Sequence, residues 1–163
     1  MQIRAAQLDD SITLADIYNQ GIEERIATFE TRPRSPEDIM GWFDKQHPIV
    51  VMEEAGKIIG FASTSDYRKN RECYAGIAEF SVYVAREARG RGVGKLVLEA
   101  LINEAGKAGF WKLVSRVFVE NSASLSLLRS VGFREVGIYV KHAKLEGVWR
   151  DVVIVERLIE KNL

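Results

Sequence analysis

The chain has 163 residues, of which 47% are hydrophobic and 28% are charged, as in an ordinary globular protein with one sizeable core. We therefore expect a single domain over residues 1–163. Lysine plus arginine and aspartate plus glutamate both total 23, so no excess of positive charge predicts nucleic acid or an anionic membrane as a partner.

The N-terminal part of the chain predicts a strand followed by two helices. Residues 2–6 are typical of a short strand, and residues 9–25 carry apolar side chains at helical spacing. A second helix is expected to begin after Ser35, a cap residue with Asp38 three positions later, and to end just before Pro48.

The middle of the chain predicts four strands and a helix. Residues 49–54 and 58–65 are apolar runs separated by a turn, which indicates an antiparallel hairpin. Residues 76–84 predict the next strand, and the helix that follows leads to a strand over residues 112–119. A strand, a helix and a strand in this order favour a parallel pair.

The C-terminal part predicts a short helix and a final hairpin. Asn121 caps the helix, and Gly132 is placed to end it in the left-handed conformation. Residues 133–144 and 148–158 predict the two strands of the hairpin. The elements add up to an α/β (α+β) fold with a mixed, mostly antiparallel sheet of six or seven strands and helices on both faces.

A glycine-rich basic loop joins the predicted strand at 76–84 to the helix that follows it. Gly90, Gly92 and Gly94 let the backbone turn tightly and direct several N–H groups toward one anion at the start of the helix. Four basic side chains surround the same opening: Arg86, Arg89, Arg91 and Lys95. The pattern predicts a binding site for a pyrophosphate, although a loop of this kind can also serve only as a connection.

Two common phosphate-binding motifs are excluded. A Walker A loop needs Ser or Thr after its lysine, but Lys95 is followed by Leu96. The dinucleotide fingerprint fails because Lys95 stands where its third glycine would be. The remaining pattern, Arg89-x-x-Gly92-x-Gly94, resembles the acyl-coenzyme A signature of the GNAT superfamily of N-acetyltransferases.

Segments along nearly the whole chain resemble one branch of that superfamily, the phosphinothricin N-acetyltransferases. They are residues 17–23, 28–33, 79–84 and 147–152. The resemblance implies acetyl-CoA as co-substrate, no metal, and acetylation of the α-amino group of a small anionic amino acid. Phosphinothricin, arsinothricin, methionine sulfoximine and methionine sulfone are such substrates. Resistance to antibiotics or herbicides can then be the role of the protein, or a side activity of an enzyme that acts on a metabolite. The branch is usually homodimeric.

The resemblance also implies roles for individual residues. Glu79 matches the catalytic base, although a strand acid can also be solvated or salt-bridged. The coenzyme-binding positions are Val82, Val84, Arg89, Gly90, Arg91, Gly92, Val93, Gly94, Lys95, Asn121 and Ser124. Substrate would face Phe29, Thr31, Arg71 and Tyr74, although Arg71 can equally belong to an exposed basic turn. Leu128 stands where many relatives have a tyrosine, which leaves the general acid unassigned.

The sequence contains few other candidate functional groups. Cys73 has no partner for a disulfide, and His47 and His142 lack metal-ligand spacing. No stretch is apolar enough to span a bilayer or to act as a leader, so we expect a soluble, cytoplasmic protein. Two other functions stay open: acetylation of another amine, such as a protein N-terminus or a polyamine, and a non-catalytic acyl-CoA sensor.

Overall fold

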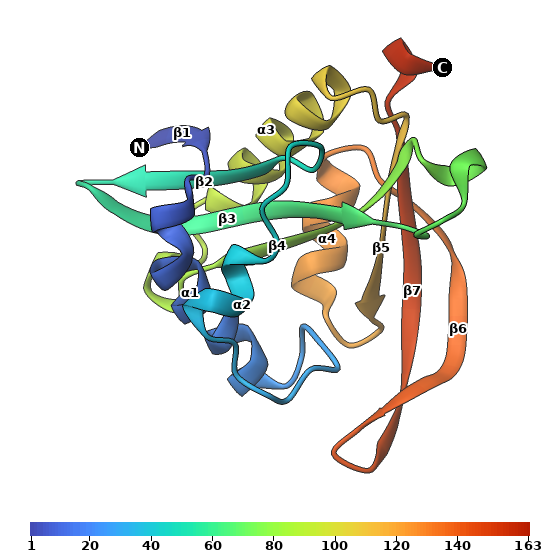
Figure 1. Ribbon diagram of the computed structural model, residues 1–163. Coiled ribbons are helices and arrows are strands. Elements are labelled where there is room, and N and C mark those ends of the chain that lie inside the picture. Colours follow the sequence, from blue (N-terminus) through green and yellow to red (C-terminus); the bar gives the residue numbers. More distant parts are fainter.

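The structure, a computed structural model, describes residues 1–163. Seven strands form one sheet in the order β1-β2-β3-β4-β5-β7-β6 (Figure 1). The strands are β1 Gln2–Ala5, β2 Ile49–Glu54, β3 Lys57–Asp66, β4 Ile77–Val84, β5 Lys112–Phe118, β6 Arg134–Leu145 and β7 Val148–Leu158. Every neighbouring pair is antiparallel except β4 and β5, which confirms the predicted sheet and its one parallel pair.

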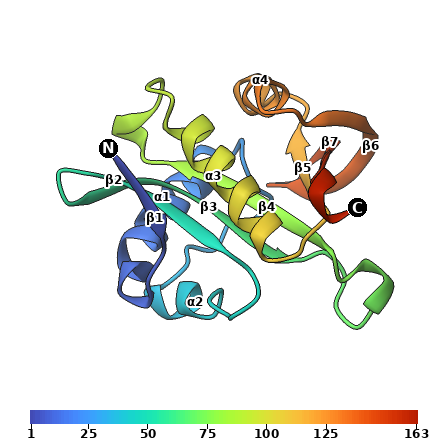
Figure 2. The same cartoon turned by 90° about the horizontal axis from the view of Figure 1, so that it is seen from above.

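Helices cover both faces of the sheet (Figure 2). They are α1 Ser11–Glu24 and α2 Pro36–Met40 on one face, and α3 Val93–Lys107 and α4 Ser122–Ser130 on the other. Fully buried side chains from both layers, such as Leu14 of α1 and Leu101 of α3, meet those of the central strands in one core of 31 residues. No helix has the length and apolar character needed to cross a membrane.

The second helix is shorter than the sequence predicts. Its start is confirmed, because the Ser35 hydroxyl accepts a hydrogen bond from the N–H of Asp38, and the Asp38 carboxylate accepts one from the N–H of Ser35. It ends at Met40, however, well before Pro48. Two residues later Trp42 packs edge-on against Tyr18 of α1, with ring centroids 5.3 Å apart. Gly41, a residue of low helix propensity, directly follows Met40, and the packing of Trp42 against α1 takes the place of a further helical turn.

The parallel pair of strands separates after three residues. β4 pairs with β5 only from Ile77 to Glu79, opposite Lys112 to Val114. Beyond that point β4 remains paired with β3 as far as Val84, and β5 remains paired with β7. A gap therefore opens in the middle of the sheet, bordered on each side by a strand that is anchored on its outer edge.

Gly76, which directly precedes β4, gives a test of how this region packs. A Cβ atom at Gly76 would lie 1.9 Å from Cε3 of Trp111, whereas one at Gly137 on β6 would meet no atom within 4 Å. We expect Gly76→Ala to lower the free energy of unfolding by about 1–3 kcal/mol through overpacking. The control Gly137→Ala should change it by less than about 0.5 kcal/mol. Equal midpoints of urea unfolding for the two variants would contradict this packing.

Candidate active site

A cavity of about 530 Å³ lies where the glycine loop meets the separated strands. At this point α3 begins at Gly92, whose φ of 80° is left-handed, as is the φ of 75° at Gly90. Glycine adopts such angles without strain. The first N–H groups of α3 have no partner within the helix, and they carry the partial positive charge of its N-terminus. The loop thus has the backbone geometry of an anion site.

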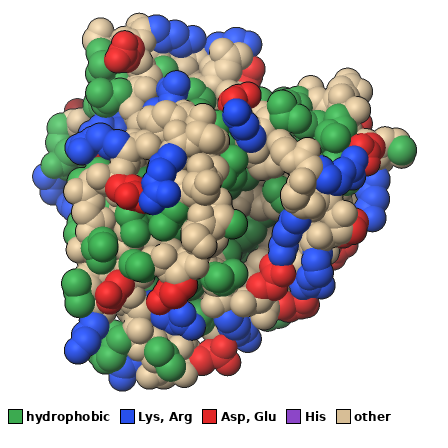
Figure 3. Space-filling model, turned by 180° about the vertical axis from the view of Figure 1, so that it is seen from behind, with side chains coloured by type: hydrophobic (Ala, Val, Ile, Leu, Met, Phe, Trp, Pro, Cys, Tyr) green, Lys and Arg blue, Asp and Glu red, His purple; other side chains and the backbone are tan.

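The structure brings most of the predicted coenzyme residues together around this cavity. Its lining includes Val82, Val84, Arg89, Gly90, Gly92, Val93, Gly94, Lys95, Asn121 and Ser124. Arg91 lies on the same loop but outside the lining, and its guanidinium pairs with Glu54 at 2.5 Å. On the face that carries α3 and α4, the surface is hollowed, with hydrophobic side chains visible inside the hollow (Figure 3).

The arginines beside the loop are already engaged by carboxylates of the same chain. Arg86 pairs with Glu23 at 3.2 Å, and Arg89 pairs with Glu24 of α1 at 2.5 Å. The Arg89 guanidinium lowers the pKa of the Glu24 carboxyl below its usual range. Lys95 forms no such pair. A phosphate entering the cavity would meet Lys95 directly and would compete with Glu24 for Arg89.

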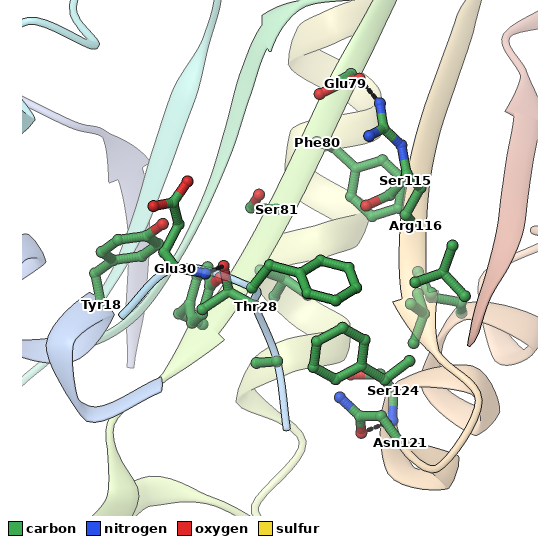
Figure 4. Close-up of a pocket in the computed structure, with 18 residues that line it drawn as sticks. Tyr18, Thr28, Glu30, Glu79, Phe80, Ser81, Ser115, Arg116, Asn121 and Ser124 are labelled. Carbon is green, nitrogen blue, oxygen red and sulfur yellow. Dashed lines mark hydrogen bonds and ion pairs between the residues drawn. The ribbon is translucent and has the colours of Figure 1, made fainter. Parts of the chain in front are cut away.

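A second cavity, of about 350 Å³, lies between the separated strands β4 and β5 (Figure 4). The segment that follows α1, residues 27–30, forms part of its wall. Residues that line both cavities are Ala27, Val82, Tyr83, Asn121 and Ser124. The two cavities therefore adjoin, with β4 passing from one to the other.

Glu79 lines the second cavity and is the last residue of β4 that pairs with β5. Its Oε1 accepts a hydrogen bond of 2.8 Å from Nη2 of Arg116, on β5 (Figure 4). The two side chains are 34% and 49% exposed. The predicted carboxylate is thus at the cavity, and it is also salt-bridged, the other reading that the sequence left open.

Sequence reasoning missed Arg116. Its signal is a charged side chain between Ser115 and Val117, in the second half of β5. That strand is predicted to run parallel to the one that carries Glu79. A lone arginine inside such a strand calls for a partner, and the neighbouring strand offers one.

Aromatic side chains form much of the remaining wall. Phe29, from the segment after α1, meets Phe118 of β5 edge-on with ring centroids 4.7 Å apart. Tyr18 and Tyr83 meet edge-on with centroids 5.0 Å apart. Burial raises the pKa of both tyrosine hydroxyls, so both remain protonated at neutral pH.

Three of the four predicted substrate residues lie outside the lining. Thr31 is two positions beyond Phe29, which does line the small cavity. Arg71 and Tyr74 lie on the loop between β3 and β4, with the Arg71 guanidinium 5.7 Å from the centroid of the Tyr74 ring.

Asn121 acts as the predicted helix cap. Its Oδ1 accepts a hydrogen bond of 3.2 Å from the N–H of Ser124 at the start of α4. Because Asn121 also lines both cavities, this structural role is compatible with the coenzyme contact predicted for it.

The histidines and the cysteine lie apart from both cavities. His47 is buried and pairs with Asp44 through Nδ1 at 2.8 Å. Cys73 is exposed. No group of three or more histidine, cysteine, aspartate or glutamate side chains is arranged to hold a metal ion.

Comparison with known proteins identifies the class of this enzyme. The model of the Acetyltransferase (GNAT) family matches residues 15–133. The chain therefore belongs to the GNAT acetyltransferase family, and its class is that of acetyl-CoA-dependent N-acyltransferases. The resemblance drawn from the glycine loop is confirmed.

Individual relatives confirm the predicted branch. The phosphinothricin N-acetyltransferase of Streptomyces coelicolor is 32% identical, over 96% of this chain and 95% of its own. The crystal structure of a phosphinothricin acetyltransferase from Sinorhizobium meliloti in complex with acetyl-CoA has a TM-score of 0.88 and 30% identity, over 96% of this chain and 87% of its own. The crystal structure of a ribosomal-protein-alanine N-acetyltransferase from Brucella melitensis has a TM-score of 0.92 and 31% identity, over 98% of this chain and 100% of its own.

Proposed function

We propose that the protein transfers the acetyl group of acetyl-CoA to the α-amino group of a small anionic amino acid. The substrates that we put first are phosphinothricin, arsinothricin, methionine sulfoximine and methionine sulfone, with resistance to such toxins in the cytoplasm as the biological role. One observation carries the proposal: Glu79 lines a small cavity that adjoins the cavity at the glycine loop, so a base, an amine and a thioester can meet there. The relatives named as phosphinothricin acetyltransferases support the substrate class.

We expect the coenzyme pyrophosphate at the glycine loop and the pantetheine arm in the gap between β4 and β5. Backbone N–H groups alternate in direction along a strand, and the N–H of Ala85 points to the carbonyl of Ile59 beside β4, at 2.8 Å. The N–H groups of Val82 and Val84 therefore point into the gap, where β5 no longer pairs. They can bind pantetheine as a neighbouring strand would, and one of them can stabilise the oxyanion. Asn121 is the further contact that we expect for the arm.

The reaction needs a group that accepts a proton from the α-ammonium before its nitrogen attacks. An α-ammonium must lose a proton before its nitrogen can attack, and in this proposal Glu79 accepts that proton. The nitrogen then forms a bond to the thioester carbonyl carbon, and collapse of the tetrahedral intermediate breaks the carbon–sulfur bond. The coenzyme leaves as a thiolate, which a thiol of ordinary acidity can do without an acid, and the second proton lost by the nitrogen passes to that thiolate or to water. No acetyl-enzyme forms.

We propose substrate contacts on two sides of Glu79. Phe29 is supported by its place in the cavity wall. Arg71 and Tyr74 lie on the loop that leads into β4, near the same end of the strand as Glu79. A second acidic group of the substrate could bind there, and Thr31 would contribute from the segment after α1.

A second candidate substrate is the N-terminal amine of a protein. The Brucella melitensis relative, named for ribosomal-protein alanine, favours it. The volume of the cavity, about 350 Å³, favours a small molecule instead. A polyamine is disfavoured because the carboxylates in the lining, Glu30 and Glu79, are each already paired with an arginine. A non-catalytic sensor would bind acetyl-CoA without any amine-dependent release of thiol.

The first experiment follows thiol release from acetyl-CoA with a panel of amines. The panel contains phosphinothricin, arsinothricin, methionine sulfoximine, methionine sulfone, glutamate, spermidine and a peptide that begins with alanine. We expect saturable activity confined to the anionic amino acids. Activity only with the peptide or with spermidine would keep the chemistry and reject the substrate class. Binding of acetyl-CoA without activity on any amine would favour the sensor.

Replacement of the proposed base gives a direct test of mechanism. We expect Glu79→Gln to lower kcat at neutral pH by about a hundredfold or more, because the amide cannot accept the proton. The affinity for acetyl-CoA, measured by calorimetry, should stay within about twofold of the unchanged protein. Unchanged turnover would remove Glu79 from this role.

The hairpin of β6 and β7 supports a homodimer as a further part of the proposal. Its exposed apolar side chains are Val136, Ile138, Tyr139, Val140, Val148 and Trp149. β6 is also an edge strand, with unpaired backbone groups along one side. We expect light scattering after gel filtration to give twice the mass of the chain, and Val140→Asp to shift the protein toward monomer. A monomer at all concentrations would contradict this assembly.

A further inference from the structure

The small cavity contains one cationic side chain, Arg116. Its carboxylates are Glu30 and Glu79. The carboxylate of Glu30 pairs with the guanidinium of Arg34 at 2.8 Å, and the Arg34 side chain is only 15% exposed. Arg116 pairs with Glu79 alone. An anion that enters this cavity can therefore pair only with Arg116, which is already paired with Glu79, the proposed base.

We propose that Arg116 binds the α-carboxylate of the substrate, and that this binding releases Glu79 to accept the proton of the adjacent α-ammonium. The inference rests on the proposed function and adds the residue that recognises the substrate class. In an α-amino acid one carbon separates the ammonium from the carboxylate. The two groups can therefore meet two side chains that are themselves in contact, as Arg116 and Glu79 are at 2.8 Å.

Exposure makes this exchange of partners feasible. Because Arg116 and Glu79 are 49% and 34% exposed, their pair is partly hydrated and contributes little to stability. The hydrogen bond between them uses Nη2 and Oε1 only. A guanidinium can bind a carboxylate through two parallel hydrogen bonds, which is the stronger arrangement. Binding of the substrate breaks the one hydrogen bond between Arg116 and Glu79. Two new pairs form, one between Arg116 and the substrate carboxylate and one between Glu79 and the substrate ammonium.

The separation of the strands puts Arg116 where this exchange can occur. β4 and β5 last pair at Glu79 and Val114. Arg116 lies two residues beyond Val114 and therefore on the same face of β5. The close-up shows Glu79 and Arg116 facing each other from the two strands at one end of the cavity (Figure 4). A carboxylate that binds Arg116 from inside the cavity thus approaches from the side where the amine must lie.

The arrangement selects against amines that lack an adjacent carboxylate. Such an amine leaves Glu79 paired with Arg116, whose positive charge stabilises the carboxylate and makes it a weaker base. The N-terminus of a protein falls in this class, because its α-carboxyl group is part of a peptide bond. Arg116 therefore distinguishes a free amino acid from the peptide amine that the Brucella melitensis relative suggests.

The test compares methionine sulfone with its α-carboxamide, in which a neutral amide replaces the carboxylate that Arg116 would bind. The quantity measured is the ratio of kcat/KM for the acid to kcat/KM for the amide. We expect Arg116→Gln to lower this ratio by at least about tenfold, through loss of a charge-assisted hydrogen bond with the acid only. Arg116→Lys, which keeps the charge, should restore part of the ratio. The control is Arg134→Gln, on an arginine that is 67% exposed, pairs with Glu156 and lines neither cavity.

The ratio separates recognition from structural damage, because a partly unfolded variant loses activity on both compounds equally. The same ratio in Arg116→Gln as in the unchanged protein, which still acetylates methionine sulfone, would overturn the role of Arg116 and leave the proposed function standing. An equal fall in Arg134→Gln would also overturn it. An unchanged protein that acetylates neither compound but does acetylate the alanine peptide would overturn both proposals together.

Discussion

The separation of β4 from β5 is the constraint on which the rest of the site depends. After Glu79 and Val114 the two strands no longer pair, yet β3 and β7 hold their outer edges in place. Each strand therefore keeps its place in the sheet along the gap. Backbone N–H and C=O groups along a strand need partners, and here a ligand with amides of its own can provide them. The same feature that removes hydrogen bonds from the sheet creates two adjoining cavities.

The local arrangement of charged side chains in this protein matters more than the net charge of the chain. Positive and negative side chains are equal in number, but the arginines near the cavities are held by nearby carboxylates. Arg89 with Glu24 and Arg91 with Glu54 are such pairs. Because these pairs are partly exposed, an incoming anion can displace the carboxylate at little cost. The free protein thus keeps its arginines ordered near the opening and avoids an excess of unbalanced positive charge.

Local patterns in the sequence predicted most of the fold. The left-handed φ of 90° at Gly132 and the reciprocal hydrogen bonds of Ser35 and Asp38 depend on residues close together in the chain, and both were expected. The length of α2 was not, since the chain leaves the helix close to Trp42, which contacts Tyr18 far away in the sequence. Arg116 was missed for a similar reason. Its partner is 37 residues away, and their contact follows from the register of two strands rather than from spacing.

In the proposed reaction, different side chains in the wall of the small cavity would act on the departing coenzyme thiol in different ways. Leu128, where many relatives have a tyrosine, is 3% exposed and lines this cavity with an aliphatic side chain that has no proton to give. Tyr18 and Tyr83 contribute hydroxyls to the same lining, and burial raises the pKa of both, which keeps them neutral donors. A neutral phenol can hydrogen-bond to a thiolate, while a leucine excludes water from it. Because a thiol of ordinary acidity can leave as a thiolate without an acid, the proposed reaction depends more on removing the proton of the ammonium than on protonating the leaving group. In the mechanism that we propose, that requirement falls on Glu79, and the state of its pair with Arg116 decides when it is met.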